Sequence, residues 1–193
     1  MESEALQAGD VWLLPGWQNS DAGHWQSRWQ ALYGYRRLEQ HDWLRPLRGD
    51  WSIRLQETVL DASRPVVLVA HSLGCILVAW WAAHAAASNA KLARKVAGAL
   101  LVAPGDTEQD NLRAMLPGWS PVMMQAMPFP SIVVGSENDP NCRLARARAM
   151  AHAWGSDFVN AGAAGHINTA SGLGNWDSGH ALLQTLQGKN KPW

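Results

Sequence analysis

Short apolar runs alternate along the chain with segments of helical periodicity. Residues 66–70 and 98–102 are aliphatic almost throughout, which is typical of strands that are buried on both faces of a sheet. Trp25, Trp29 and Leu32 are spaced i, i+4 and i+7, so they fall on one face of a helix. The pattern therefore indicates strands and helices that follow one another in turn.

The same pattern gives an approximate position for each element. It predicts strands at residues 11–14, 36–39, 66–70, 98–102, 132–134 and 158–159. It predicts helices at residues 24–32, 52–60, 74–87, 143–154 and 181–186. Ser20 or Asp21 is expected to cap the first helix. The apolar positions of the second helix are expected to be Ile53, Leu55, Val59 and Leu60.

Strands that alternate with helices form a parallel sheet with helices on both faces. We therefore predict an α/β fold, a three-layer sandwich whose mainly parallel sheet has about six strands flanked by helices. A chain of 193 residues has the size of one domain, and residues 1–193 are predicted to form it. Right-handed crossovers place the loop after each strand at the C-terminal edge of the sheet, where ligands bind in such folds.

The segment with the most chemical information is AHSLG at residues 70–74. It joins an apolar run to the predicted helix 74–87, so Ser72 falls on a strand-to-helix turn. A sharp turn of this kind, called a nucleophile elbow, exposes a serine hydroxyl above the sheet. Ala70 replaces the usual first glycine, and alanine is the next smallest residue. The pattern predicts that Ser72 is a nucleophile that attacks a carbonyl carbon.

A serine hydroxyl is a weak nucleophile unless a base removes its proton, and the base needs an orienting carboxylate. In hydrolases with a nucleophile elbow, the chain order is serine, acid and histidine. Ser72, Asp139 and His166 occur in that order, each after a separate predicted strand. Backbone N–H groups must also stabilise the oxyanion, and we expect them to come from Trp17 and Leu73.

The acid and the base each have a competitor in the sequence. Asp106 follows the fourth predicted strand, where some hydrolases place the acid, whereas chain order favours Asp139. The Asn-Asp-Pro sequence around Asp139 is also ordinary turn chemistry. His180 competes with His166, but it lies at the start of a predicted helix and not in a loop after a strand.

Composition limits the classes of partner. Sixteen Lys and Arg residues balance sixteen Asp and Glu residues, so no basic field is predicted that would bind nucleic acid or an anionic membrane surface. The N-terminus lacks the apolar core of a secretory signal and no apolar run reaches membrane-spanning length, so a cytoplasmic location is expected. Cys75 and Cys142 are too few for a disulfide framework and are expected to be packed thiols. Neither metal-ligand spacing nor a glycine-rich phosphate loop occurs, so we expect no metal and no cofactor.

Residues 106–130 are expected to be irregular, and they lie where hydrolases often insert a lid. The segment contains Met115, Met123, Met124 and Met127, and methionine suits an adaptable apolar surface. An ordinary helix packed on the sheet is the alternative, and the sequence leaves both open. The twelve tryptophans of the chain are expected to fill the core or line a cleft.

Taken together, these motifs resemble the small α/β-hydrolases of the retinoblastoma-binding-protein/YdeN type. The resemblance is carried by LPGW at 14–17, AHSLG at 70–74, LVAP at 101–104, PFPS at 128–131, NDPNC at 138–142 and AAGHIN at 163–168. It covers nearly the whole chain. It implies a six-stranded parallel sheet without the two leading strands of larger hydrolases, a triad of Ser72, Asp139 and His166, and esterase-like activity on small acyl substrates.

The function predicted from the sequence is that of an esterase-like serine hydrolase. Its partner would be a small-molecule acyl substrate, an ester, thioester or activated amide that is cleaved through an acyl-enzyme. Two alternatives remain. The first is a non-enzymatic module that binds a ligand or protein on a hydrolase scaffold. The second is an acyltransferase that uses the same triad. An unreactive Ser72 would distinguish the binding module from a hydrolase. Analysis of the reaction products would distinguish an acyltransferase from a hydrolase.

Overall fold

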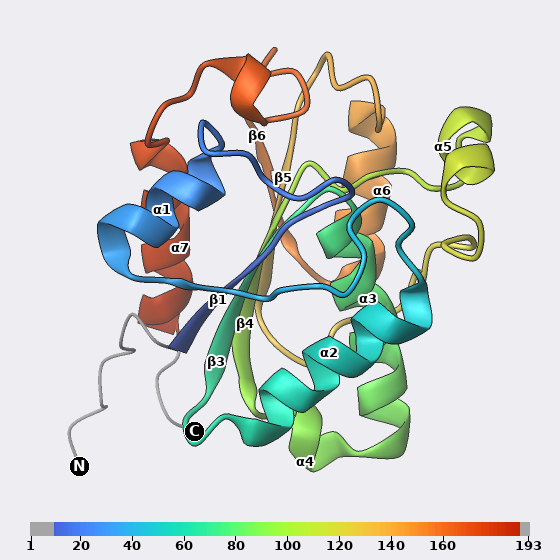
Figure 1. The fold of residues 1–193 in the computed structure, drawn as a ribbon, viewed down its shortest axis with the longest axis vertical. Coiled ribbons are helices and arrows are strands. Elements are labelled where there is room, and N and C mark those ends of the chain that lie inside the picture. Colours follow the sequence, from blue (N-terminus) through green and yellow to red (C-terminus); the bar gives the residue numbers. More distant parts are fainter. Residues whose placement is uncertain (1–9, 190–193) are drawn as a thin grey trace.

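The computed structural model describes residues 10–189, and within this range six strands form one sheet (Figure 1). The strands are β1 (Val11–Leu14), β2 (Arg36–Arg37), β3 (Val66–His71), β4 (Val96–Val102), β5 (Ser131–Gly135) and β6 (Asp157–Asn160). Their order is β2-β1-β3-β4-β5-β6, and every neighbouring pair is parallel. The predicted α/β fold with a parallel sheet of six strands is confirmed.

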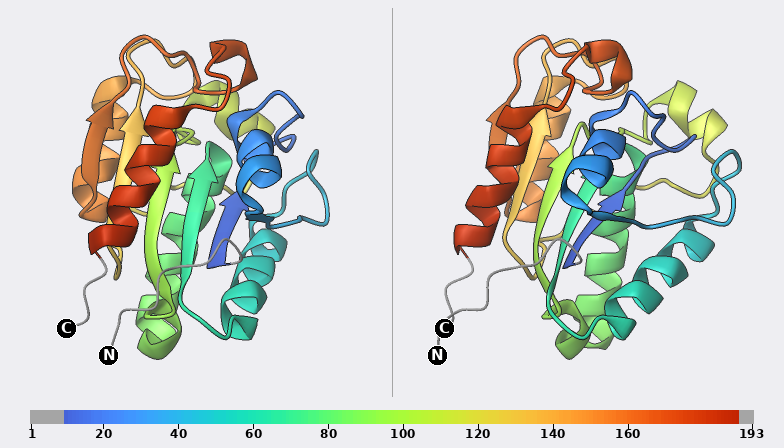
Figure 2. Two further views of the ribbon diagram at one scale, coloured as in Figure 1. Left: turned by 90° about the vertical axis from the view of Figure 1, so that its left-hand side faces the viewer. Right: turned by 60° about the vertical axis from the view of Figure 1, so that its left-hand side comes forward.

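Helices cover both faces of the sheet. They are α1 (Trp25–Tyr33), α2 (Arg48–Asp61), α3 (Leu73–Ser88), α4 (Ala90–Ala93), α5 (Asp110–Met115), α6 (Leu144–Trp154) and α7 (Asp177–Lys189). Figures 1 and 2 show α1 and α7 on one face, and α2, α3 and α6 on the other. The apolar core is divided accordingly. Val67 and Val69 of β3 pack toward α1 and α7, whereas Leu68 and Ala70 pack toward the opposite helices.

Buried tryptophans tie distant loops to the body of the fold. Six tryptophans of the described chain are almost fully buried, namely Trp25, Trp29, Trp51, Trp81, Trp119 and Trp154. The indole N–H of every one of these except Trp81 donates to a main-chain carbonyl in another part of the chain. Trp25, for example, donates to the carbonyl of Ile167 at 2.8 Å. A buried indole N–H usually finds such an acceptor, so the five tryptophans that donate hold loops in place as well as fill the core.

The apolar face of α2 differs from the prediction. The helix begins one turn earlier than expected and buries Trp51, Leu55 and Val59, whose i, i+4 spacing forms one stripe. Two predicted core residues, Ile53 and Leu60, are 58% and 48% exposed. Ile53 lies two residues after Trp51, about 200° around the helix axis, so the two residues cannot both face the core.

The cap of α1 and the structure of residues 106–130 also differ from the predictions. His24 is the N-cap of α1, and its Nδ1 accepts the N–H of Gln26 at 3.1 Å. Asp21 instead accepts the N–H groups of Gly23 and His24. The segment 106–130 is not irregular throughout, because it contains α5. The predicted second strand shortens to the two residues of β2.

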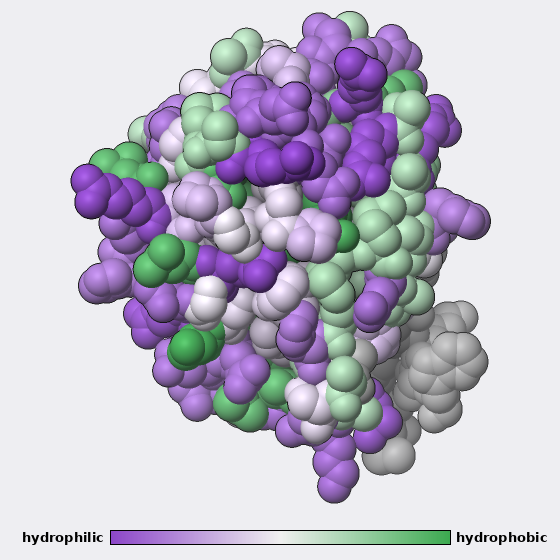
Figure 3. Space-filling model, turned by 90° about the vertical axis from the view of Figure 1, so that its right-hand side faces the viewer, coloured by the Kyte–Doolittle hydropathy of each residue, from purple (hydrophilic) through white to green (hydrophobic). Residues whose placement is uncertain are grey.

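The surface is mixed in character. On the face shown in Figure 3, strongly hydrophobic residues lie singly or in small groups among hydrophilic ones. The large apolar side chains exposed in the described part of the chain are Leu32, Leu44, Leu47, Ile53, Leu60, Met115 and Met124. Between residues 10 and 189, none of the helices has the length and apolar character needed to cross a bilayer.

Gly74 and Gly49 each occupy the second position of a helix, but only Gly74 is enclosed. A Cβ atom on Gly74 would collide with the carbonyl oxygens of Leu14 and Pro15, whereas nothing lies within 4 Å of one on Gly49. We expect Gly74→Ala to lower the free energy of unfolding by about 2 kcal/mol, because α3 must move away from β1. Gly49→Ala is expected to raise it by up to about 1 kcal/mol. Denaturant unfolding measures both, and equal effects in the two variants would contradict this account.

Candidate active site

Ser72 lies in a strained turn between β3 and α3. Its φ of 54° and ψ of −118° fall in a region that residues other than glycine rarely adopt. The main chain of the turn is nevertheless paired. The N–H of Ser72 donates to Val102 and its carbonyl accepts from Cys75, both at 3.0 Å. Strain of about 1–3 kcal/mol persists only where the surrounding structure enforces it, and it concentrates at functional sites.

Glycines allow two loops to approach Ser72 closely. A Cβ atom on Gly16 would lie 2.8 Å from the Cβ of Ser72 and 3.3 Å from the main-chain nitrogen of Leu73. A Cβ atom on Gly105 would lie 3.5 Å from the hydroxyl oxygen of Ser72. The loops after β1 and β4 therefore both border the serine, and larger side chains at these two positions would obstruct it.

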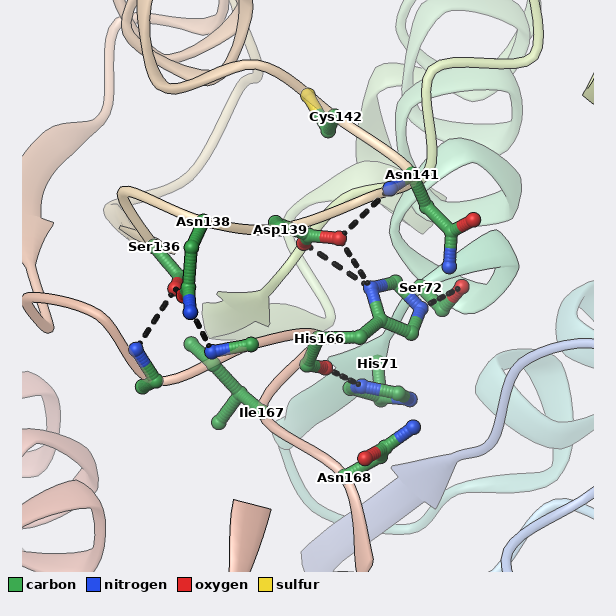
Figure 4. Close-up of polar contacts among 12 residues, drawn as sticks. His71, Ser72, Ser136, Asn138, Asp139, Asn141, Cys142, His166, Ile167 and Asn168 are labelled. Atoms are coloured by element: carbon green, nitrogen blue, oxygen red, sulfur yellow. Dashed lines mark hydrogen bonds and ion pairs between the residues drawn. The ribbon is translucent and has the colours of Figure 1, made fainter. Parts of the chain in front are cut away.

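Figure 4 shows that Ser72, His166 and Asp139 form one hydrogen-bonded chain. The hydroxyl oxygen of Ser72 lies 2.8 Å from Nε2 of His166. Nδ1 of His166 lies 2.9 and 3.0 Å from the two carboxylate oxygens of Asp139. Because a carboxylate only accepts hydrogen bonds, Nδ1 carries the proton and Nε2 is left to accept from the serine. The three residues selected from the sequence thus meet, each from the loop after a different strand.

The competing acid and the competing histidine bind other groups. Oδ1 of Asp106 lies 3.4 Å from Nε of Arg146, and the same arginine pairs with Glu108 at 2.6 Å. Nε2 of His180, inside α7, lies 2.7 Å from the hydroxyl of Tyr35. Neither residue takes part in the hydrogen-bonded chain at Ser72. The Arg146 pairs instead fasten the start of segment 106–130 to α6.

Two side chains that the sequence did not single out hold the acid loop against the histidine loop. The hydroxyl of Ser136 donates to the carbonyl of Gly162 at 3.1 Å and accepts the N–H of Ala164 at 3.0 Å. Oδ1 of Asn138 accepts the N–H of Gly165 at 2.7 Å. Short polar residues in turns commonly bond to nearby backbone. The serine and asparagine in the loop after β5 could therefore have indicated these contacts.

Two further histidines lie beside the site. Nε2 of His71 donates to the carbonyl of His166 at 2.8 Å, and the ring centroids of these two residues are 4.9 Å apart. The ring of His24 lies 4.7 Å from that of His71. Burial lowers the pKa of His71 well below its ordinary value and the pKa of His24 to about 4. Both rings are therefore neutral at pH 7. Sequence reasoning missed these contacts, because His71 and His166 are 95 residues apart.

The two residues expected to supply oxyanion donors both lie beside Ser72. Leu73 is the first residue of α3, so its N–H has no acceptor within the helix. Trp17 lies in a turn closed by the N–H of Asn19 and the carbonyl of Gly16, and its indole N–H donates to Leu44 at 3.0 Å. Leu73 and Trp17 line the same cavity as the serine.

A cavity of about 410 Å³ opens at Ser72 and His166. Its volume is in the range of small-molecule sites. Its apolar lining includes Leu112, Met115 and Leu116 from α5 and the residue after it. Its polar lining includes residues of the loops around 18–24 and 166–169. A hydrogen bond of 2.8 Å from the hydroxyl of Thr169 to Asp21 joins these two loops.

Neither cysteine belongs to the hydrogen-bonded chain at Ser72. Cys75 and Cys142 are free and buried, which confirms the prediction of packed thiols. Burial raises the pKa of both thiols, that of Cys142 to about 12. In the part of the chain that the structure describes, no group of three or more His, Cys, Asp or Glu side chains is arranged to hold a metal ion.

Solved structures that share this fold include hydrolases. A YdeN-like hydrolase from Pectobacterium atrosepticum is 27% identical, with a TM-score of 0.80 over 94% of this chain and 92% of that chain. The ydeN gene product of B. subtilis is 17% identical, with a TM-score of 0.70 over 92% and 98% of the chains. A thermophilic esterase from Thermogutta terrifontis is 14% identical, with a TM-score of 0.65 over 97% and 92%. At these identities the last two likenesses show the fold alone. No curated protein sequence matches the chain.

The family model described as Serine hydrolase matches residues 11–185. The match spans all six strands and includes Ser72, Asp139 and His166. Together with the YdeN-like structure from Pectobacterium atrosepticum, it confirms the resemblance that the sequence motifs carry. The chain therefore belongs to the serine hydrolase family.

Proposed function

We propose that the protein is an esterase-like hydrolase in which Ser72 is the nucleophile, His166 the general base and Asp139 the residue that orients the base. The observation that carries the proposal is the hydrogen-bonded chain of these side chains, 2.8 Å from serine to histidine and 2.9 Å from histidine to aspartate. The strained backbone of Ser72 gives independent support. Family membership supports hydrolysis as the reaction class.

The reaction begins when Oγ of Ser72 attacks the carbonyl carbon of the substrate and Nε2 of His166 takes the hydroxyl proton. Asp139 holds the proton on Nδ1 and stabilises the resulting imidazolium. The tetrahedral intermediate then collapses, the bond to the leaving group breaks, and the proton on Nε2 passes to that group. Water attacks the acyl-enzyme with the same proton transfers, which releases a carboxylic acid and restores Ser72.

The charge that develops on the carbonyl oxygen needs hydrogen-bond donors. We assign this role to the main-chain N–H groups of Leu73 and Trp17, because both residues border the cavity next to Ser72. Gly16 brings the Trp17 loop against the serine, as its close approach to Leu73 indicates. One such donor typically contributes a factor of about 10² to 10³ in rate.

The proposed substrate is a small, uncharged ester, thioester or activated amide. The volume of about 410 Å³ limits its size, and Leu112, Met115 and Leu116 provide apolar contact for an acyl or alkyl group. Asp21 also lines the cavity, and the hydrogen bond from Thr169 is the main reason that its pKa is lowered. A carboxylate that stays ionised at this position disfavours an anionic substrate.

Hydrolysis of p-nitrophenyl esters of increasing acyl length tests the proposal. The purified protein is expected to turn over the acetate and butyrate with the highest kcat/KM and the palmitate with the lowest, because a long chain exceeds the cavity. The acyl product should be the free carboxylic acid. Turnover of none of the esters, or fastest turnover of the palmitate, would contradict the proposed substrate class.

A further inference from the structure

His71 connects the nucleophile to the base in two ways. His71 is the last residue of β3, and it directly precedes Ser72 in the chain. Its side chain reaches the histidine loop, where Nε2 donates to the carbonyl of His166 at 2.8 Å (Figure 4). One residue therefore ties the strand that carries the serine to the main chain of the base, although the two lie in separate loops.

The hydrogen bond defines the chemical state of His71. A carbonyl only accepts, so the proton must be on Nε2 of the imidazole. His71 is 5% exposed, which limits the access of water to this bond. Burial also holds the pKa of His71 well below its ordinary value. The ring next to His166 is thus a neutral donor and not a second cation.

Neighbouring groups keep His71 and the histidine loop in place. The ring of His24 packs edge-on against His71 at 4.7 Å, and His24 is itself oriented by the N–H of Gln26. The next carbonyl along the loop, that of Ile167, accepts the indole N–H of Trp25 at 2.8 Å. Ile167 has a φ of +47°, which a side chain branched at Cβ rarely adopts. Two consecutive carbonyls of the loop are therefore held by buried donors.

We infer that His71 is a positioning residue, whose Nε2–H fixes the main chain of His166 so that its imidazole stays within hydrogen-bond reach of Ser72. The inference rests on the proposed role of His166 as the base. Catalysis is sensitive to such placement, since a displacement of about 1 Å can lower a rate by about 10²-fold. Because the bond is made to the base and not to substrate, its loss should appear in kcat more than in KM.

Two substitutions of similar length separate the hydrogen bond from the packing of the ring. In His71→Gln the amide N–H₂ can still donate to the carbonyl of His166, whereas His71→Met has an unbranched side chain without a donor. We expect His71→Met to lower kcat for p-nitrophenyl acetate by about 10- to 100-fold with little change in KM, and His71→Gln to retain most of the activity. His84→Met is the matched control, because His84 is an exposed histidine on α3. It should leave both constants unchanged.

The results that overturn the inference are specific. A wild-type kcat in His71→Met would overturn it. A loss of kcat in His71→Gln as large as that in His71→Met would also overturn it, because the missing hydrogen-bond donor would then not explain the loss. If His71→Met does not fold by circular dichroism, His71→Asn replaces it, since its shorter amide cannot reach the carbonyl of His166. Loss of kcat in that variant supports the inference, and wild-type kcat refutes it. Turnover that persists without the Ser72 hydroxyl would instead refute the proposed function itself.

Discussion

Replacement of Ser72 by alanine is expected to lower kcat/KM for p-nitrophenyl acetate by a factor on the order of 10⁴ to 10⁶. Alanine retains the Cβ atom and can keep the turn, but it removes the hydroxyl that lies 2.8 Å from His166. Without that oxygen no acyl-enzyme forms, so the loss should appear in kcat. The remaining rate would reflect binding and the oxyanion donors alone.

Ser88→Ala is the matched control for this variant. Ser88 is exposed at the opposite end of α3, where its hydroxyl donates to the carbonyl of His84 at 2.7 Å. We expect this variant to keep the kcat of the unmodified protein. Thermal unfolding should show that Ser72→Ala remains folded. Ester turnover that persists in folded Ser72→Ala would contradict the role assigned to Ser72.

Replacement of Asp139 by asparagine is expected to lower kcat by about 10⁴-fold, the effect seen when the acid of a serine triad is neutralised. Asp139 accepts from Nδ1 of His166 through both carboxylate oxygens. An asparagine amide can present N–H groups to Nδ1, which favours the tautomer that carries its proton on Nε2. That tautomer cannot take the proton of Ser72. Ester kinetics over a range of pH values would measure the loss.

Asp106→Asn provides the comparison for the acid. It weakens the pair of Asp106 with Arg146 but leaves the contact between Arg146 and Glu108 at 2.6 Å. We expect its kcat to stay close to that of the unmodified protein, because Asp106 does not contact His166. A large loss in Asp106→Asn together with a small loss in Asp139→Asn would reverse the assignment of the acid.

The arrangement of the site follows from features that are local in the sequence. Aliphatic runs identified β3 and β4 because both strands are buried by helices on each side of the sheet. In a parallel sheet, the loops after the strands meet at one edge. Ser72, Asp139 and His166 each follow a predicted strand, so the strand pattern predicted that they lie at this edge, and chain order favoured Asp139 over Asp106 as the acid.

The details that the sequence did not predict depend on contacts between distant segments. The buried face of α2 includes Trp51, whose ring packs against Trp119 from another part of the chain. The bond from His71 to His166 spans 95 residues, and the bond from Trp25 to Ile167 spans 142. No periodicity or short motif encodes such pairs, because they form only when the sheet brings the loops together.

Mass spectrometry of the protein after reaction with a fluorophosphonate probe tests the central claim most directly. The probe phosphonylates a serine only when a neighbouring base activates its hydroxyl. The account predicts a single adduct, on the peptide that contains Ser72, and none in Ser72→Ala. An adduct on a different residue, or an unlabelled Ser72 in a preparation that hydrolyses p-nitrophenyl acetate, would contradict it.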